Sequence, residues 1–182
     1  HFMQERGWHV SAIEKSPQAR QFAKEHFELD VAAPEALNEF ADKSFDVITL
    51  WHVMEHLEHL NETWETLKRI LKDQGILIIA VPNPTSFDAE KYKEMWGAYD
   101  VPRHLWHFSP SVMQQFGAKH DFILCERHPM PFDAFYVSML SEKYRESAFP
   151  FLKGLIAGTE AWIVSLAKKD RSSSMIYVFR KK

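Results

Sequence analysis

The sequence is short of cysteine, of net charge and of long apolar runs, and each shortage excludes a class of protein. Cys125 is the single cysteine among 182 residues, so no disulfide can form within the chain, which fits a reducing cytoplasm. A formal net charge of -3 argues against a nucleic-acid surface, which would need clustered lysine and arginine. The most apolar stretch, 149–167, is interrupted by charged residues and glycines, so we expect no stable membrane insertion. The polar first residues carry no signal-peptide core.

What the sequence does contain is a series of short apolar runs separated by amphipathic segments. The chain is 46% hydrophobic and 26% charged, which suits one globular domain. The runs 47–50 and 76–81 are continuously apolar or β-branched, as in parallel strands covered on both faces. This alternation predicts an α/β fold with a doubly wound, mostly parallel sheet and an antiparallel C-terminal strand. The expected strands are 8–14, 27–31, 47–50, 76–81, 122–126 and 175–180.

Capping residues indicate where the helices begin. Ser16 at the N-cap and Pro17 at the first helical position open one helix, and Ser109 opens another. Asn61 is expected to cap a third helix that runs to Lys72. The apolar residues of this third helix recur at helical spacing and predict its buried face, formed by Trp64, Leu67, Ile70 and Leu71.

Two segments fall outside the alternation of strands and helices. Residues 85–108 read as one irregular aromatic loop, and so long a loop in a compact domain is usually functional. Residues 128–171 read as a helical insertion or cap, and the helix within 149–167 has one large apolar face. We expect this face in the core or in a homodimer contact, with a substrate cap and a membrane-surface helix as alternatives. Its members are Leu152, Leu155, Ile156, Thr159, Trp162, Ile163 and Leu166.

The loop after strand 47–50 gathers aromatic and titratable side chains, Trp51, His52, Glu55 and His56. In open α/β sheets ligands sit beyond the carboxyl ends of such strands, so we expect the chemistry here. His52-x-x-Glu55-His56 also matches a zinc metallohydrolase pattern, in which a helix places the ligands on one face. A strand that leads directly into His52 argues against that geometry. The plainer interpretation is that Glu55 and His56 hydrogen-bond the loop, and no metal is expected.

Four stretches together resemble class I S-adenosylmethionine-dependent methyltransferases, in particular the ubiquinone-type O-methyltransferase group. They are 7–17, 45–56, 75–83 and 99–109, and the last resembles the lid of one subgroup. Their order and spacing are more specific than any single piece. The resemblance implies S-adenosylmethionine as the cofactor. The resemblance extends to about Arg127. We expect a Rossmann-like domain formed by 1–127 and 172–182, with 128–171 as a helical insertion that lies outside the resemblance.

The resemblance implies which residues bind the cofactor. Glu14 resembles the acid after the second strand that accepts hydrogen bonds from both ribose hydroxyls. Asp30 resembles the acid that meets the adenine amino group, while Val31 covers the ring. Trp51 follows the strand where the family's loop lines the methionine end, and an aromatic face attracts the sulfonium cation. The full implied set is Glu14, Lys15, Asp30, Val31, Trp51 and His52.

The lid-like stretch supplies the candidates for catalysis. Methyl transfer is a direct in-line displacement that needs alignment and desolvation more than a covalent nucleophile. The acceptor is expected to be a small molecule, with oxygen favoured over nitrogen or carbon. His104 or His107 would take the proton of a hydroxyl acceptor, because histidine titrates near neutrality. Tyr99 and Arg103 would orient the acceptor.

The family's glycine-rich motif and the strand before it would precede His1. The chain begins in what reads as a last helical turn closed by Gly7. A parallel sheet without that strand would expose two unpaired edges. We therefore expect a fragment of a longer enzyme that binds the cofactor weakly. The rival hypothesis is a non-catalytic binding module that keeps the fold.

Overall fold

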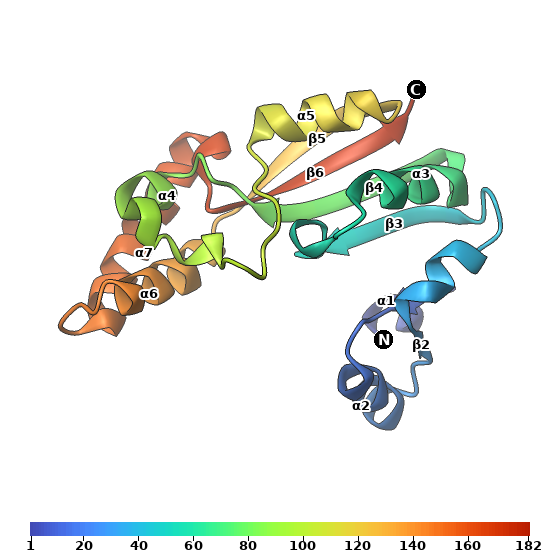
Figure 1. Ribbon diagram of the computed structural model, residues 1–182, viewed down its shortest axis with the longest axis horizontal. Helices are drawn as coiled ribbons and strands as arrows, with labels where there is room; N and C mark the ends of the chain where they lie inside the picture. The colour runs from blue at the N-terminus through green and yellow to red at the C-terminus, as the bar shows by residue number, and fades with distance from the viewer. The chain divides into compact units, whose positions relative to one another are not determined.

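A computed structural model describes residues 1–182 as two compact units, 1–44 and 45–182 (Figure 1). The first unit pairs two short strands in parallel, with Ala12 opposite Val31. No residue of this unit is fully buried. Its elements are α1 (Phe2–Glu5), β1 (Ala12–Ile13), α2 (Pro17–Phe27), β2 (Val31–Ala32) and the 3-10 helix η1 (Pro34–Glu39).

Local capping explains how the first unit folds. The Ser16 hydroxyl accepts a hydrogen bond from the Ala19 N–H at 3.2 Å, and Pro17 opens the helix, as predicted. The two strand predictions for this unit are too long. The helix continues to Phe27 and ends in a left-handed cap at Glu28, so a strand cannot begin before Val31.

The second unit is built on a four-stranded sheet in the order β3-β4-β6-β5. β3 and β4 run parallel, whereas β6 runs antiparallel to both of its neighbours. The mixed α/β fold class and the antiparallel C-terminal strand are therefore confirmed. In β3 only Leu50 is fully buried, because β3 is an edge strand of this sheet. The strands are β3 (Phe45–Trp51), β4 (Leu71–Pro82), β5 (Phe122–Met130) and β6 (Ser174–Lys181).

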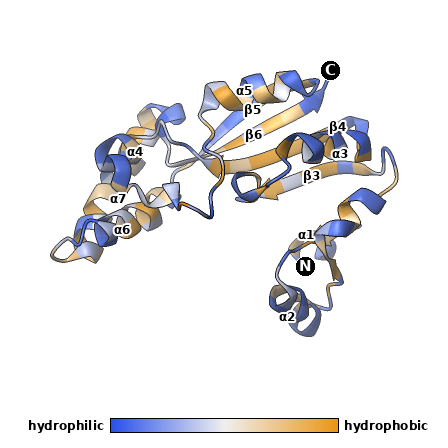
Figure 2. Cartoon of the chain, viewed as in Figure 1, coloured by the Kyte–Doolittle hydropathy of each residue, from blue (hydrophilic) through white to orange (hydrophobic).

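Two helices cover the sheet of this unit, α3 (Leu60–Ile70) and α5 (Pro110–Lys119). The predicted inner face of α3 is confirmed for Trp64, Leu67 and Ile70, which are buried. The helix ends two residues before the predicted end at Lys72, and Leu71 is buried as the first residue of β4 instead. The predicted N-cap is wrong: His59 occupies that position without a side-chain bond, and the Asn61 amide oxygen accepts instead from Lys119 Nζ of α5. Figure 2 shows the apolar character of the strands beneath these helices.

Residues 85–108 are less irregular than predicted. They contain α4 (Phe87–Tyr92) and the 3-10 helices η3 (Lys93–Met95) and η4 (Gly97–Tyr99). A buried carboxylate, Asp88, organises the segment by accepting hydrogen bonds from Trp96 Nε1 at 2.7 Å and from Ser173 Oγ at 2.6 Å. These hydrogen bonds give the segment a fixed structure that its composition does not reveal, because one partner, Ser173, is 85 residues away in the sequence.

The insertion forms a hairpin of two helices, α6 (Asp133–Tyr144) and α7 (Pro150–Ala167), beside α4 (Figure 1). The small residues of α7 are buried, among them Gly154, Ala157 and Gly158. Most of the large residues predicted to lie in the core are exposed, including Leu152 and Ile163, so that prediction is wrong. Small side chains allow α7 to approach the α6 backbone closely, which leaves the large side chains outside.

No helix of the chain has both the length and the apolar character needed to cross a membrane. The homodimer contact stays a prediction.

Gly154→Ala is expected to destabilise the helical hairpin by about 1–3 kcal/mol through overpacking. A Cβ at this position would lie 2.5 Å from Met139 Cα and 2.8 Å from Met139 N, which are backbone atoms of α6. The clash should outweigh the better helix propensity of alanine, about 1 kcal/mol. Urea unfolding would measure the loss, and Leu152→Ala on the exposed face of α7 should change stability by less than about 0.5 kcal/mol. Equal stability of the two variants would contradict the packing described here.

Candidate active site

The carboxyl end of β3 turns sharply into the site. His52 follows the last strand residue, Trp51, with φ +51, a left-handed conformation that is costly for a non-glycine residue. Its N–H still donates to the Ala80 carbonyl of β4 at 3.0 Å. The turn leads into the 3-10 helix η2 (Met54–His56), in which Met54 and Glu55 are buried. The backbone conformation therefore projects the side chains of 52–56 beyond the end of the sheet.

Two carboxylates flank the His52 imidazole. Nδ1 lies 3.2 Å from Glu55 Oε1, and Nε2 lies 3.3 Å from Asp133 Oδ2, at the first residue of α6. The hydrogen bonds from Asp133 and Glu55 raise the pKa of His52 from 6.5 to about 9. His52 is therefore an imidazolium at neutral pH. It joins the end of β3 to the helical insertion.

Asp133→Asn is expected to lower the pKa of His52 and to reduce the loss of stability at alkaline pH. The folded pKa of about 9 lies above the unfolded value, so the ion pairs stabilise the fold fully below about pH 6.5. That contribution is lost as the pH rises through about 9. An NMR titration of the ring protons would measure the pKa, with Glu58→Gln as the control. A His52 pKa near 6.5 in the unaltered protein would rule out the ion pairs.

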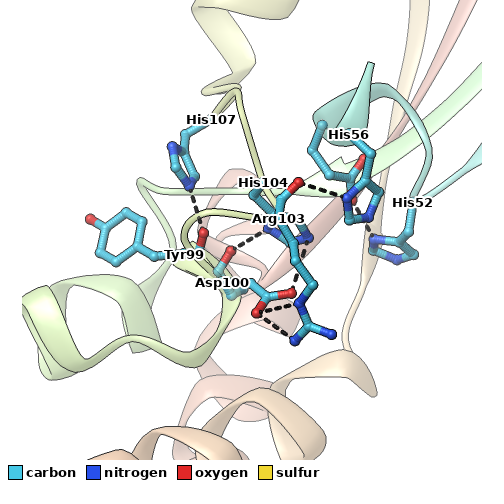
Figure 3. Close-up of polar contacts among 9 residues, drawn as sticks. His52, His56, Tyr99, Asp100, Arg103, His104 and His107 are labelled. Atoms are coloured by element: carbon cyan, nitrogen blue, oxygen red, sulfur yellow. Dashed lines mark hydrogen bonds and ion pairs between the residues drawn. The ribbon is translucent and has the colours of Figure 1, made fainter. Parts of the chain in front are cut away.

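The lid-like segment is hydrogen-bonded to the η2 loop (Figure 3). The Leu105 N–H donates to the Glu55 carbonyl at 2.8 Å, and Trp106 Nε1 donates to the Leu57 carbonyl at 2.8 Å. In the opposite direction, His56 Nδ1 donates to the Arg103 carbonyl at 2.9 Å. These bonds bring residues about fifty positions apart in the sequence to one place.

Glu55, His56 and His104 form the centre of the site. One nitrogen from each ring and one Glu55 oxygen lie within 4.8 Å of one another, so these residues could hold a cation. His104 Nδ1 donates to the Ala98 carbonyl at 2.8 Å, so Nε2, which lies 3.9 Å from Asp100 Oδ2 and makes no hydrogen bond, is the nitrogen that a ligand could reach. Burial lowers the pKa of His104 and favours the neutral ring. A neutral imidazole with an open nitrogen is the usual form of a general base.

The other predicted lid residues divide into two groups. His107 Nε2 donates to the Tyr99 carbonyl at 3.0 Å, and its ring meets Tyr99 edge to face at 5.1 Å and His104 edge to face at 6.4 Å (Figure 3). Arg103 is largely exposed and forms an ion pair with Asp100 at 2.6 Å. Of the four predicted catalytic residues, His104 is therefore the one that the structure brings into the cluster.

The cofactor residues predicted in the first unit lie in or beside its short strands. Glu14 and Lys15 follow β1, and Glu14 Oε1 accepts from the Ser16 N–H at 2.7 Å. Asp30 is exposed and pairs with Lys24 at 3.2 Å. Val31 begins β2 and is half-buried. Carboxylates at strand ends with oxygen atoms accessible to solvent are chemically suited to ribose or adenine, so the residues present fit the expected cofactor.

Sequence reasoning identified Glu55 but missed Asp133. The interpretation of Glu55 as a residue that hydrogen-bonds the loop holds for Oε1, which contacts His52, whereas Oε2 is buried without a hydrogen-bond partner. Asp133 lies in the insertion, where no motif pointed to the site. The signal for Glu55 was its position beyond a strand end, whereas Asp133 carries no local signal.

The zinc pattern is not assembled as a metallohydrolase would need, because His52 binds Glu55 and Asp133 and is absent from the cluster with His56.

Comparisons with known proteins agree with this architecture. A family model described as a methyltransferase domain matches residues 1–125. A structure of an S-adenosylmethionine-dependent methyltransferase from Archaeoglobus fulgidus has a TM-score of 0.61 and 16% identity, over 99% of this chain and 79% of that one. A candidate sarcosine dimethylglycine methyltransferase from Galdieria sulphuraria has a TM-score of 0.63 and 14% identity, over 99% and 72%.

A third similar structure contains a bound cofactor product. The 1,6-didemethyltoxoflavin N1-methyltransferase of Burkholderia thailandensis was solved with S-adenosylhomocysteine and has a TM-score of 0.58 and 13% identity, over 100% of this chain and 64% of that one. No curated protein matches the sequence. At these identities the structures establish the fold, while the family model covers more than half of the chain. The chain belongs to the methyltransferase-domain family, and its cofactor is S-adenosylmethionine.

Proposed function

We propose that this protein transfers a methyl group from S-adenosylmethionine to a small molecule that binds beside Glu55 and His104. The observation that carries the proposal is the His104 ring, which has Nδ1 bonded to a backbone carbonyl, Nε2 3.9 Å from Asp100 Oδ2, and a buried carboxylate, Glu55, in the same cluster at the carboxyl end of β3. In an α/β sheet this is where ligands bind. The cofactor supplies an electrophilic methyl group, and the residues of this chain must position the acceptor and accept its proton.

Each residue of the site has a distinct task in this proposal. The lid segment, hydrogen-bonded to the η2 loop, excludes water from the acceptor. His104 takes the proton, while Glu55 stabilises the charge that develops there. Asp133 positions His52 and so ties the insertion to the site, which supports the proposal that 128–171 acts as a cap. The resemblance in sequence favours oxygen as the acceptor atom, whereas the contacts within the site, argued in the next subsection, favour nitrogen.

The residues proposed to hold the cofactor are those predicted from the resemblance. The Glu14 carboxylate would accept hydrogen bonds from the ribose, and Asp30 with Val31 would meet the adenine. The indole of Trp51 is half exposed at the end of β3, as a ring that receives a sulfonium must be. Lys15 and His52 complete the proposed set.

Titration with S-adenosylhomocysteine by isothermal calorimetry tests the proposed function. We expect weak one-to-one binding that Glu14→Ala weakens by a further factor of about 10 to 100, because a charged hydrogen-bond partner of the ribose is lost. Glu35→Ala is the matched control, since Glu35 is an exposed acid of the same unit. No binding by the unaltered chain would favour the non-catalytic binding module instead.

A further inference from the structure

The centre of the site presents hydrogen-bond acceptors without an occupant. Glu55 is 1% exposed, its Oε1 is engaged by His52, and its Oε2 has no partner. A buried carboxylate oxygen without a donor is costly, about 1–3 kcal/mol or more. The structure therefore has an unsatisfied acceptor at the point where the two histidine rings meet.

The two histidines are oriented so that each offers a second acceptor. His56 Nδ1 donates to the Arg103 carbonyl and His104 Nδ1 donates to the Ala98 carbonyl. Because each carbonyl requires a hydrogen on Nδ1, a neutral ring has its lone pair on Nε2. The rings stand edge to face with centroids 4.7 Å apart. Three acceptors are thus available, with no donor among them.

The spacing of these acceptors fits one small group with several N–H donors. One nitrogen of each ring and one carboxylate oxygen of Glu55 lie within 4.8 Å of one another, so by the geometry of a triangle a central point lies no more than about 2.8 Å from each of these three atoms. Hydrogen bonds from nitrogen span about 2.7–3.2 Å, so a nitrogen near this point reaches all three acceptors. A hydroxyl has a single hydrogen and would leave two acceptors unpaired, whereas a primary ammonium has three.

The charges around the cluster favour a ligand with a single positive charge. Glu55 belongs to the cluster, Asp100 Oδ2 lies 3.9 Å from His104 Nε2, and Asp133 is joined to Glu55 through His52. Two cations, His52 and Arg103, pair with these three carboxylates. One negative charge is left over, which a single ammonium would balance. His56 is exposed and gives access from solvent, while Trp106, anchored to the same loop, presents a partly exposed indole at the rim.

We propose that Glu55, His56 and His104 bind the primary ammonium group of an amine, and that this amine is the methyl acceptor. The second half of the statement rests on the proposed function. The ammonium first gives one proton to Nε2 of His104, which later releases it to solvent. The nitrogen lone pair then forms the N–C bond to the methyl group as the C–S bond breaks and its electron pair stays on sulfur. The product is a secondary ammonium.

The test compares 2-phenylethylamine, 2-phenylethanol and Zn²⁺ as separate ligands, each titrated by calorimetry and by NMR of the histidine rings. We expect the amine to bind at least about tenfold more tightly than the alcohol and to shift the His56 and His104 signals. Glu55→Gln should weaken amine binding by at least about tenfold, while Glu58→Gln, an exposed acid three residues away, should change it less than twofold. The ring shifts in the unaltered protein keep the test decisive if Glu55→Gln does not fold.

Several results would overturn the ammonium site. Equal affinity for amine and alcohol would do so, as would Zn²⁺ binding to these rings that the amine cannot displace. If S-adenosylhomocysteine binds and the amine does not, the ammonium site is wrong and the proposed methyl transfer stands. If the amine binds in the predicted way and S-adenosylhomocysteine does not, the ammonium site is supported and the methyl transfer is wrong.

Discussion

His104→Ala is expected to lower the rate of methyl transfer by about 100- to 10,000-fold, the usual contribution of a positioned general base. The reason is geometric: the Ala98 carbonyl fixes Nδ1 of a ring that lies in one cluster with the Glu55 carboxylate, so Nε2 is the nitrogen that can take a proton. Burial lowers the pKa of His104, so the ring is neutral and able to accept a proton at neutral pH. Release of S-adenosylhomocysteine with a panel of amines and hydroxyl compounds would measure the rate.

Variants of two other histidines serve as controls for this experiment. His107 lies on the same lid but packs against Tyr99, so His107→Ala should cost less than His104→Ala. His59 is exposed at the start of α3 and makes no side-chain cap bond, so His59→Ala should leave the rate unchanged. If His104→Ala kept full turnover, the base would have to be sought elsewhere. A larger loss for His107→Ala would transfer the role to that residue.

The sequence predicts an element correctly where the local pattern of apolar or capping residues matches the surroundings of those residues in the folded chain. The run 76–81 is apolar because it lies in β4, between β3 and β6, and its strand prediction is confirmed. Ser16 and Ser109 cap their helices as predicted because an N-cap bond involves only neighbouring residues. Asn61 fails as a cap because tertiary contacts with α5 recruit its side chain.

The error in α7 has a different origin. Its large apolar residues recur at helical spacing and therefore predict a buried face, yet Leu152 and Ile163 are exposed. Burial is decided by the partner: α6 lies so close that only Gly154, Gly158 and neighbouring small residues fit between the two helices. Periodicity identifies the two faces of a helix but cannot rank a close contact between small residues against a wide contact between large ones.

The site could be located but not assembled from the sequence. The position after β3 and the lid stretch were both identified, because strand ends and long aromatic segments are local features. The pairing of His56 with Arg103 and of His52 with Asp133 joins segments 47 and 81 residues apart, which no local pattern encodes. The geometry of the candidate site therefore depends on tertiary contacts, which form only when the chain folds.

Trp64→Ala is expected to destabilise the second unit by about 3–5 kcal/mol, the usual cost of removing a large buried aromatic side chain. Trp64 has no exposed surface and meets Phe116, Phe122 and Phe179 edge to face, with centroids 5.2–5.6 Å apart. These contacts join α3 to α5, β5 and β6, so the cavity would lie at the centre of the core. Urea unfolding followed by circular dichroism would measure the loss.

Two further variants identify the cause of that loss. Trp64→Phe should cost less than half as much, since a ring remains and the indole N–H, buried without a partner, is removed. Trp8→Ala removes the same side chain from a half-exposed position in the first unit and should cost less than about 1 kcal/mol. If Trp64→Ala lost no more than Trp8→Ala, α3 would not be packed on the sheet through Trp64. Because η2 leads directly into α3, a displaced α3 would also release the loop that carries Glu55 and His56.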